Sequence, residues 1–328
     1  MIYADQRWIG NHGIGRFARN VLPALRYTPI PLGGRPAAPL DAWRLSRALR
    51  NLTRDDLFFS PGYNAPLFCP SGFIFTIHDL SHIYCAENSS PLIRLYYATV
   101  GKRACHRAAA VLTVSEFTRS QIVEWSGIAS DRVINVSCGV DASYRPEGDT
   151  FRFPFPYLLC VSNRKPHKNE SRLIAAFAKA KVHAMHLVFS GEASPEIMKS
   201  IEQQRVKDRV HFTGIVPEEN LPGLYRGANA LVFPSLYEGF GLPVLEAMAC
   251  GLPVVTSNVT AMPEVASDAA LLVDPTSLDQ IADSIEQIVN DNSLRSCLRQ
   301  KGLARAAQFS WSETSDRIKK VINLIVRR

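Results

Sequence analysis

Two glutamates, Glu238 and Glu246, bracket a glycine-containing turn in the sequence Glu-Gly-Phe-Gly-Leu-Pro-Val-Leu-Glu. The apolar run at residues 230–234 predicts a buried strand before the turn, and the proline after it suits the first turn of a helix. Gly239 and Gly241 would let the backbone approach a ligand, and a helix N-terminus attracts anions. The segment therefore predicts a diphosphate cradle, with Glu246 in the first helical turn. A plain chain reversal followed by a dipole-favoured acid is the alternative.

A second candidate is the basic segment Val-Ser-Asn-Arg-Lys-Pro-His-Lys-Asn, which carries Arg164 and Lys168 between a predicted strand and a predicted helix. Positive side chains at a helix N-terminus are repelled by the helix dipole, so a bound phosphate would explain why they cluster there. Lys165 is the weaker candidate for a phosphate contact. A solvated basic turn is the alternative interpretation.

Residues 10–18, Gly-Asn-His-Gly-Ile-Gly-Arg-Phe-Ala, superficially fit a dinucleotide-binding fingerprint. In that fingerprint the first glycine follows its strand at once, and an acidic residue ends the second strand about 20 positions later. Here about eight residues intervene and the next acid is Asp41, so we reject a dinucleotide site. Gly15 would still allow a close approach. Arg16 fits a phosphate or acceptor contact and a solvated first-turn position equally well.

The segment Ile-His-Asp-Leu-Ser-His places His78 and His82 around Asp79. It is superficially similar to the zinc motif H-E-x-x-H, but the acid is the wrong one, no third ligand is evident, and a strand rather than a helix leads into it. No metal site is therefore predicted. A strand-end His78 beside a capping Asp79 is the simplest interpretation.

The elements that must position these residues alternate between short apolar runs and helical patterns, which predicts an α/β protein with doubly wound parallel sheets. The predicted strands are residues 2–4, 57–60, 73–77, 111–114, 133–136, 157–161, 186–190, 210–213, 230–234, 253–256 and 270–273. The predicted helices are residues 16–27, 41–51, 91–109, 116–126, 169–180, 195–205, 218–227, 243–250 and 277–290. The proline-rich segment 27–39 is expected to be a loop.

Length and composition suit two globular domains, since the chain has 328 residues, of which 46% are hydrophobic. The net charge of +7 favours an anionic partner, but the dispersed basic residues do not indicate nucleic acid. Seven cysteines without a C-x-x-C pair predict reduced thiols. No apolar run approaches the ~18 residues of a spanning helix, and no signal peptide is evident. A cytoplasmic protein is expected.

The segment from Glu238 to Glu246 resembles the E-x7-E motif of family-4 retaining glycosyltransferases, which have the GT-B fold of two Rossmann-like domains facing a central cleft. The Pro-Ser before it and Ala-Met-Ala-Cys-Gly-Leu-Pro-Val-Val after it match as well. The resemblance implies that Glu246 binds the ribose hydroxyls and that Glu238 contacts the donor sugar. The backbone amides it implies for phosphate or sugar oxygens are those of Gly239, Phe240, Gly241 and Leu242.

The basic segment resembles the Arg…Lys-Asn phosphate motif of the same family. By that resemblance Arg164 and Lys168 clamp the diphosphate and neutralise charge on the leaving group. The segment around Gly15 and Arg16 is similar to the Gly-Ile-Gly-Arg loop of these enzymes, which borders the donor and acceptor sites. These matches and those to the glutamates point to one donor site.

Many members of this family carry a His-Asp pair after a strand of the first domain. The resemblance implies that His78 reaches the donor sugar and that Asp79 orients it. Prolines and glycine within residues 144–156 mark the domain boundary. The implied organisation is an acceptor-side domain at residues 1–148, a nucleotide-sugar-binding domain at 149–310, and a helix at 311–328 that crosses back to the first domain.

The implied activity is metal-independent, retaining transfer of a hexosyl group from a nucleotide-diphosphate sugar to a glycan or polyprenyl-diphosphate-linked glycan. Similarity to bacterial O-antigen and exopolysaccharide enzymes favours mannosyl transfer from GDP-mannose in surface polysaccharide or lipopolysaccharide synthesis. No metal or pyridoxal phosphate is expected. The alternative is another GT-B enzyme, such as a nucleotide-sugar epimerase or a phosphorylase. A non-catalytic binding module is a third interpretation, and the intact Glu238, Glu246, Arg164 and Lys168 argue against it.

A membrane contact is the remaining expectation. The predicted helix at residues 91–109 carries four basic residues beside five large apolar ones, which fits a helix resting on anionic lipid at the inner face of the cytoplasmic membrane. A core-packing helix with a solvated basic face is an equally good interpretation.

Overall fold

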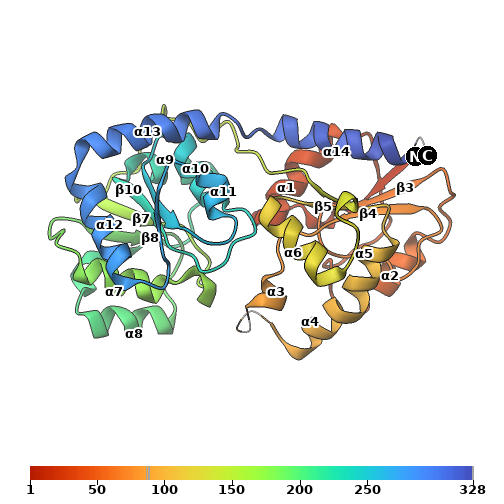
Figure 1. Cartoon of the computed structure of the whole chain (residues 1–328), viewed down its shortest axis with the longest axis horizontal. Helices are drawn as coiled ribbons and strands as arrows, with labels where there is room; N and C mark the ends of the chain where they lie inside the picture. Colours follow the sequence, from red (N-terminus) through yellow and green to blue (C-terminus); the bar gives the residue numbers. More distant parts are fainter. Residues whose placement is uncertain (86, 88, 327–328) are drawn as a thin grey trace. The chain divides into compact units, whose positions relative to one another are not determined.

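The computed structural model describes residues 1–85, 87 and 89–326, and the chain divides into two units (Figure 1). Unit 1 comprises Met1–Gly139 and Ser310–Arg328, and unit 2 comprises Val140–Phe309. The chain thus leaves unit 1 at Gly139 and returns to it at its C-terminal end. The last two residues of the helix expected at 311–328 lie outside the described residues.

Unit 1 is built on a parallel six-stranded sheet in the order β2-β1-β3-β4-β5-β6. Its strands are β1 Ile2–Ala4, β2 Thr28–Pro29, β3 Leu57–Ser60, β4 Gly72–Thr76, β5 Ala110–Thr113 and β6 Val133–Asn135. All residues of β3 and β5 are buried, as expected for strands covered by helices on both faces. Strand β2 lies in the segment predicted to be a loop. A two-residue strand is too short to show hydrophobic periodicity.

The helices of unit 1 are α1 Gly13–Val21, α2 Asp41–Ala48, α3 Ser81–Tyr84, α4 Pro91–Tyr96, α5 Lys102–Arg107, α6 Glu116–Ser126 and α14 Trp311–Val326. Helix α1 packs against α14. It begins before the predicted start because His12 acts as its N-cap, with Nδ1 accepting from the Gly15 N–H at 3.0 Å. The helix predicted at residues 91–109 is present as α4 and α5 joined by a π-helical turn, Tyr97–Gly101.

Unit 2 is built on a second parallel six-stranded sheet, in the order β12-β11-β10-β7-β8-β9. Its strands are β7 Tyr157–Cys160, β8 His186–Phe189, β9 Val210–Phe212, β10 Ala230–Phe233, β11 Val254–Ser257 and β12 Leu271–Val273. Each predicted strand of the second half is present within one residue at either end. Continuous apolar runs bury both faces of these strands, which made them easy to recognise.

The helices of unit 2 are α7 Glu170–Lys179, α8 Pro195–Gln204, α9 Leu221–Gly227, α10 Leu242–Ala249, α11 Met262–Ala266, α12 Leu278–Asn290 and α13 Asn292–Ala306. Helix α7 packs against α8 and α12, and α10 packs against α9, α11 and α13, so the sheet is covered on both faces (Figure 1). Helix α13 was not predicted. Only Leu298, Gly302 and Ala306 are buried along it, too few for a strong helical pattern.

Among the described residues, no helix combines the length and the apolar character needed to span a bilayer. The two parallel sheets with their flanking helices confirm the predicted α/β class of two doubly wound Rossmann-like domains.

Candidate functional site

The carboxyl end of β7 gathers four charged side chains. Burial raises the pKa of the Cys160 thiol, the last residue of the strand, and four nearby charges act on it as well. These are Glu170, Arg164, Lys168 and Glu238. Ligands of doubly wound sheets bind beyond the carboxyl ends of the strands, so the structure brings three of the predicted site residues to a suitable edge.

Lys168 and Glu238 form the central ion pair of this cluster. The Lys168 Nζ donates to Glu238 Oε1 at 2.6 Å, and the two side chains are 13% and 11% exposed. The ammonium also lies 5.5 Å from the ring centre of Phe233, at the end of β10. Lysine has three N–H donors, so the bond to Glu238 leaves the ammonium able to donate to a phosphate oxygen. The pair is held at the solvent boundary rather than sealed inside.

The donors of Arg164, unlike those of Lys168, are taken up by several groups of the protein itself. Its guanidinium is paired with the buried carboxylate of Glu170 and donates to the backbone carbonyls of Ser190 and, at 2.8 Å, Glu192. It also lies 5.2 Å and 5.3 Å from two stacked phenylalanine rings. The backbone of Arg164 has a positive φ of 61°, which costs a non-glycine residue energy. Because its donors are directed at the Glu170 carboxylate and at two backbone carbonyls, Arg164 organises the loop after β7.

Asn169 joins the basic segment to the segment that follows β10 and leads to Glu238. Its side-chain amide donates to the carbonyl of Pro234 at 2.9 Å and to that of Pro275 at 2.7 Å, while its oxygen accepts from Arg172 at 2.7 Å. Asn169 takes a left-handed φ of 63° between a 3-10 turn and α7, a conformation that asparagine tolerates better than most residues. Sequence reasoning gave this residue no role. Its position directly after Lys168 was the available signal.

The glycine turn between Glu238 and α10 is shaped by contacts within the protein. Gly241 has φ 105°, and a Cβ there would lie 2.2 Å from the Met262 Cε, so only glycine fits. The Glu238 N–H donates to the Thr260 hydroxyl at 3.2 Å. Phe240 is 7% exposed and packs edge-on against Phe309 with ring centres 5.8 Å apart. The turn is therefore fixed from the β11–α11 side, a constraint that the local sequence does not reveal.

Glu246 is buried rather than at the mouth of the turn. It is 3% exposed, and its Oε2 accepts from the Tyr225 hydroxyl at 2.7 Å. Because α10 begins at Leu242, Glu246 is beyond the first turn of that helix, which contains no acid. The expectation of a first-turn position is therefore wrong. A buried carboxylate needs a hydrogen-bonding partner, and Tyr225, on α9, is a partner that sequence reasoning missed.

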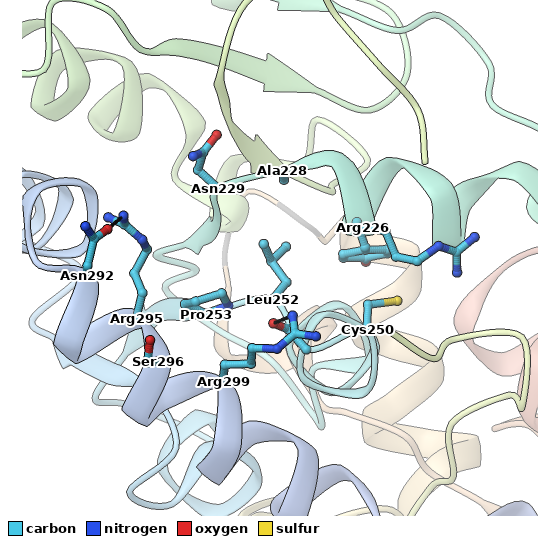
Figure 2. A pocket seen from close by; sticks show the side chains of 12 residues that line it. Arg226, Ala228, Asn229, Cys250, Leu252, Pro253, Asn292, Arg295, Ser296 and Arg299 are labelled. Carbon is cyan, nitrogen blue, oxygen red and sulfur yellow. Dashed lines mark hydrogen bonds between the residues drawn. The ribbon is translucent and has the colours of Figure 1, made fainter. Parts of the chain in front are cut away.

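A separate hollow of about 390 Å³ lies at the amino ends of β10 and β11, away from the charged cluster (Figure 2). Three arginines line it, but each donates to the backbone: Arg226 to the Asp149 carbonyl at 2.8 Å, Arg295 to the Ile288 carbonyl at 2.8 Å, and Arg299 to the Gly251 carbonyl at 3.0 Å. In Figure 2 the Arg226 head group points away from the other two. These arginines donate to carbonyls at the ends of helices and in a loop, so no ligand site is assigned to them.

In unit 1, the predicted Gly15 is packed against the backbone of its own loop. A Cβ at Gly15 would lie 2.3 Å from the Gly10 carbonyl oxygen, so the close approach that this glycine permits is made by the protein chain. Arg16 is part of α1, and its backbone carbonyl accepts from the Asn20 side chain at 2.9 Å. Sequence reasoning was right about the need for glycine and did not foresee which group approaches it.

His78, which follows β4, is fixed in one orientation. Its Nε2 donates to the Pro61 carbonyl at 2.8 Å, and its ring lies edge-on to Phe17 with centres 4.8 Å apart. Burial lowers the pKa of His78, although the Pro61 carbonyl and Asp79 oppose this. The neutral ring therefore carries its proton on Nε2 and leaves Nδ1 as the acceptor. The Asp79 carboxylate accepts from the Ser81 N–H at 2.8 Å, so it binds the first residue of α3.

A buried network holds the turn that carries Pro61. Arg7 pairs with Asp5 and Asp41, each at 2.7 Å. The fully buried Asn64 donates to the same two carboxylates at 2.8 and 3.1 Å, and it accepts from the Trp8 indole N–H at 2.6 Å. Residues far apart in sequence meet here at the carboxyl ends of β1 and β3, so no local pattern could have predicted this network.

Within residues 1–85, 87 and 89–326, no three histidine, cysteine, aspartate or glutamate side chains converge to form a metal site. The chemistry available at the described site residues is thus that of a cation–carboxylate pair, a buried carboxylate and a glycine turn leading into a helix. Such a set suits binding of a diphosphate rather than covalent attack.

Comparison with known proteins identifies the class. Residues 151–305 match the model of "Glycosyl transferases group 1", and residues 8–144 match that of "Glycosyltransferase Family 4". The sucrose-phosphate synthase of Thermosynechococcus elongatus superposes with a TM-score of 0.79 at 20% identity, over 99% of this chain and 98% of that one. WaaG, a glycosyltransferase of lipopolysaccharide biosynthesis, gives 0.74 at 16% identity, over 98% and 99%. These neighbours have the predicted GT-B fold.

The O-antigen chain mannosyltransferase B of Escherichia coli is 33% identical over 287 residues, which cover 82% of this chain and 74% of that protein. The chain therefore belongs to the family-4 glycosyltransferases, as predicted. The serotype-specific mannosyltransferase WbdA of Escherichia coli is 30% identical over 73% of this chain. The match covers only 32% of WbdA.

Proposed function

We propose that this glycosyltransferase moves a mannosyl group from a nucleotide-diphosphate sugar to a glycan or polyprenyl-diphosphate-linked glycan in surface polysaccharide synthesis, such as that of O-antigen or exopolysaccharide. The observation that carries the proposal is the Lys168–Glu238 pair beside the glycine turn, in a chain whose relatives include O-antigen mannosyltransferases. Those relatives are transferases rather than epimerases, so the epimerase alternative has no support from them.

In the proposed mechanism, unit 2 binds the nucleotide diphosphate. Lys168 donates to a phosphate oxygen and stabilises the charge that develops on the leaving group, and the amides of the glycine turn add further donors. Glu238 holds the ammonium in place and contacts the donor sugar. Glu246 accepts from the ribose hydroxyls while Tyr225 keeps its carboxylate oriented. Arg164 acts by fixing the loop that presents Lys168.

We further propose that transfer is retaining and metal-independent and requires no cofactor. The cationic and amide donors of unit 2 support metal independence, because they supply the positive charge that a metal would otherwise bring to a departing diphosphate. His78, neutral and held by Pro61, is proposed to contact the transferred sugar. Gly15 shapes the neighbouring loop, and Arg16 is a secondary candidate for a phosphate or acceptor contact.

GDP-mannose is the favoured donor. The competing nucleotide is UDP, which appears with glucose in the solved Anabaena Alr3699/HepE, a fold neighbour with a TM-score of 0.78 and 17% identity. A thermal-shift panel of GDP-, UDP-, ADP- and TDP-sugars separates the two. We expect stabilisation by GDP-mannose and GDP alone. Stabilisation by UDP-sugars only would contradict the donor assignment.

Transfer itself is tested with GDP-mannose and a water-soluble mannosyl acceptor in the presence of EDTA, with the anomeric configuration of the product read by NMR. An α-linked product formed at an undiminished rate in EDTA is expected. A β-linked product would overturn retention, a requirement for added metal would overturn metal independence, and conversion of the donor without any acceptor would restore the epimerase.

We propose, finally, that the protein acts in the cytoplasm as a peripheral protein at the inner face of the membrane, since a polyprenyl-linked acceptor would lie there. Sedimentation with anionic vesicles at low ionic strength is the test. Failure to sediment would remove the membrane but leave the transferase, which is assayed with a soluble acceptor.

A further inference from the structure

The outward face of α2 in unit 1 combines apolar and basic side chains. Inward-facing positions such as Ala42 and Leu45 are buried, whereas Leu40 at the N-cap is 75% exposed and Trp43 is 53% exposed. Arg47 follows Trp43 by one helical turn, and its guanidinium lies 5.9 Å from the indole centre. A large exposed tryptophan next to arginines is unusual for a surface that contacts water only.

A neighbouring loop widens the apolar part of this face. The Leu67 N–H donates to the Ala42 carbonyl at 3.4 Å, and the Phe68 N–H donates to the Ser46 hydroxyl at 3.0 Å. Both loop side chains are themselves exposed, Leu67 to 43% and Phe68 to 56%. We call Leu40, Trp43, Arg44, Arg47, Arg50, Leu67 and Phe68 together the α2 face.

On its other side, the α2 face borders a groove of about 420 Å³. The groove is lined by Pro31, Leu32, Trp43, Arg44, Arg47, Ala48, Arg50 and Asn51. No carboxylate belongs to this lining, and in the described part of the chain none of its three arginines forms an ion pair. The nearby Asp41 is buried and already paired with Arg7. The groove therefore has a positive potential that only an external anion would neutralise.

The presence of both arginines and exposed apolar side chains on the α2 face indicates which kind of ligand it would bind. Three arginines without a carboxylate partner favour phosphate groups, although one of them, Arg44, donates to the Gly33 carbonyl at 3.0 Å. Exposed tryptophan, leucine and phenylalanine beside them favour the headgroup region of a bilayer, where amphipathic rings and apolar side chains are stabilised. A neutral glycan would stack on Trp43 but would not explain the arginines. A free phosphate would use the arginines but not Leu40, Leu67 or Phe68.

The predicted helix at residues 91–109, for which membrane contact and core packing were equally good interpretations, has less apolar surface to offer a bilayer. Of its five large apolar residues, Leu92 and Leu95 are exposed, at 78% and 58%, while Ile93, Tyr96 and Tyr97 pack in the core of unit 1. Lys102 lies over the ring of Trp125. Most of the apolar surface expected to face lipid is thus used inside the protein.

We propose that the α2 face docks unit 1 on an anionic phospholipid bilayer, with lipid phosphates in the groove and Trp43, Leu40 and Phe68 in the headgroup region. The proposal rests on the proposed function in one respect only, that a membrane-linked acceptor makes such docking useful. It names the surface and the lipid class that the peripheral association would use.

The test is sedimentation of the full chain with vesicles of phosphatidylethanolamine and phosphatidylglycerol, with phosphatidylcholine vesicles as the uncharged control. The triple variant Arg44→Gln/Arg47→Gln/Arg50→Gln should lower vesicle binding by about 100-fold, because each basic residue near an anionic surface contributes about a factor of five. The matched control is Arg152→Gln/Lys199→Gln/Lys207→Gln, which makes the same change in net charge on unit 2 and should bind nearly as wild type does.

Insertion of side chains into the bilayer is measured separately from electrostatic attraction to it. Trp43 fluorescence should be quenched by brominated lipids in the wild type, and the quenching should disappear in Trp43→Tyr. Leu92→Ser/Leu95→Ser tests the rival helix. Because the proposal places both leucines outside the lipid contact, binding should stay within about threefold of wild type, whereas two inserted leucines would each contribute more than about tenfold. Because all these side chains are at the surface, transfer to a soluble acceptor should be unchanged in every variant.

Three outcomes would overturn the proposal. Loss of binding in the Leu92/Leu95 variant with full binding by the arginine variant would move the contact to α4. Absence of wild-type binding to anionic vesicles, together with saturable binding of inorganic phosphate lost in the arginine variant, would make the groove a site for soluble phosphate. Binding of a soluble mannan fragment that is lost in Trp43→Tyr would make it a glycan site. Transfer to a soluble acceptor would continue in all three cases, so the proposed function is judged separately.

Discussion

Both units collect charged residues at the carboxyl ends of their strands, but they use them in opposite ways. In unit 1, Arg7, Asp5 and Asp41 are 6%, 0% and 2% exposed, and each charge is satisfied by the others and by Asn64. In unit 2, Lys168 and Glu238 remain 13% and 11% exposed at the edge of a glycine turn. A sealed network resists exchange of partners because each buried charge would be left uncompensated. A pair at the boundary can accept a ligand.

Unit 2 itself contains both kinds of ion pair. The Glu170 carboxylate is 3% exposed and so resembles the carboxylates of the unit 1 network, whereas Glu238 is 11% exposed. The two cations, Arg164 and Lys168, are both 13% exposed. Sequence reasoning grouped Arg164 with Lys168 as equal phosphate contacts. The contrast in their surroundings predicts that substitution separates them.

The largest effect is expected for Arg164→Ala. Removing the guanidinium leaves the buried Glu170 carboxylate with the Ser162 hydroxyl but without its counter-ion. The cost for a fully buried pair is about 3–5 kcal/mol of unfolding free energy. Because Arg164 is 13% exposed, the cost here should lie at or below that range, and activity should fall with the folded fraction. Chemical denaturation followed by circular dichroism measures this. Arg164→Ala/Glu170→Gln is the control and should recover part of the lost stability. If Arg164→Ala were as stable as the wild type, Arg164 would again be a candidate for direct contact with the diphosphate.

Lys168→Ala should reduce turnover by about 10²–10³-fold, the range typical for removal of one donor to a developing charge. Its melting temperature should fall less than that of Arg164→Ala, because the carboxylate left behind, Glu238, is 11% exposed and can be hydrated, whereas Glu170 is 3% exposed. Steady-state kinetics with GDP-mannose provides the measurement. Lys165→Ala, which removes an exposed lysine of the same turn, is the matched control and should keep nearly full activity. A fully active Lys168→Ala would break the distinction between the two pairs.

Asn64→Leu probes the sealed network of unit 1. The substitution leaves the Trp8 indole N–H without its partner, at a cost of about 1–3 kcal/mol for an unsatisfied buried group. It also removes one donor from each of the Asp5 and Asp41 carboxylates, which keep Arg7. The freed turn should also loosen the Pro61 carbonyl that holds His78. Proton-detected ¹⁵N spectra of histidine should show the Nε2–H tautomer of His78 in the wild type and a mixture in the variant. An unchanged tautomer together with lowered stability would restrict the network to a structural role.

The smallest effect expected is a pH dependence from His78. Because burial lowers its pKa below the ordinary value of 6.5, the unfolded chain binds more protons than the folded one between the lowered pKa and 6.5. Stability is therefore complete above pH 6.5 and is lost as the pH falls toward the lowered value. Denaturation from pH 5 to 8 should show a shallower decline in His78→Gln than in the wild type. A decline of equal slope in both would assign it to other histidines.

Local patterns predicted much of this protein, for identifiable reasons. The strands of unit 2 were recognised because strands buried on both faces are continuously apolar, and the E-x7-E segment together with the Lys-Asn step marked the class of enzyme. Unit 1 was less regular, and β2, α3 and the π-helical turn were missed because short or distorted elements carry too few residues to show a period.

The sequence by itself determined the two doubly wound domains, the transferase family and the positions of the glycines and charged residues that form the candidate site. Only the tertiary structure decided how those residues are used: that Met262 and Gly10 are what Gly241 and Gly15 accommodate, that Arg164 faces Glu170 while Lys168 faces Glu238, and that α2 rather than the helix at 91–107 presents an apolar and basic surface. The physical reason is that burial and the choice of charge partner depend on contacts between segments far apart in the chain, which a local pattern does not encode.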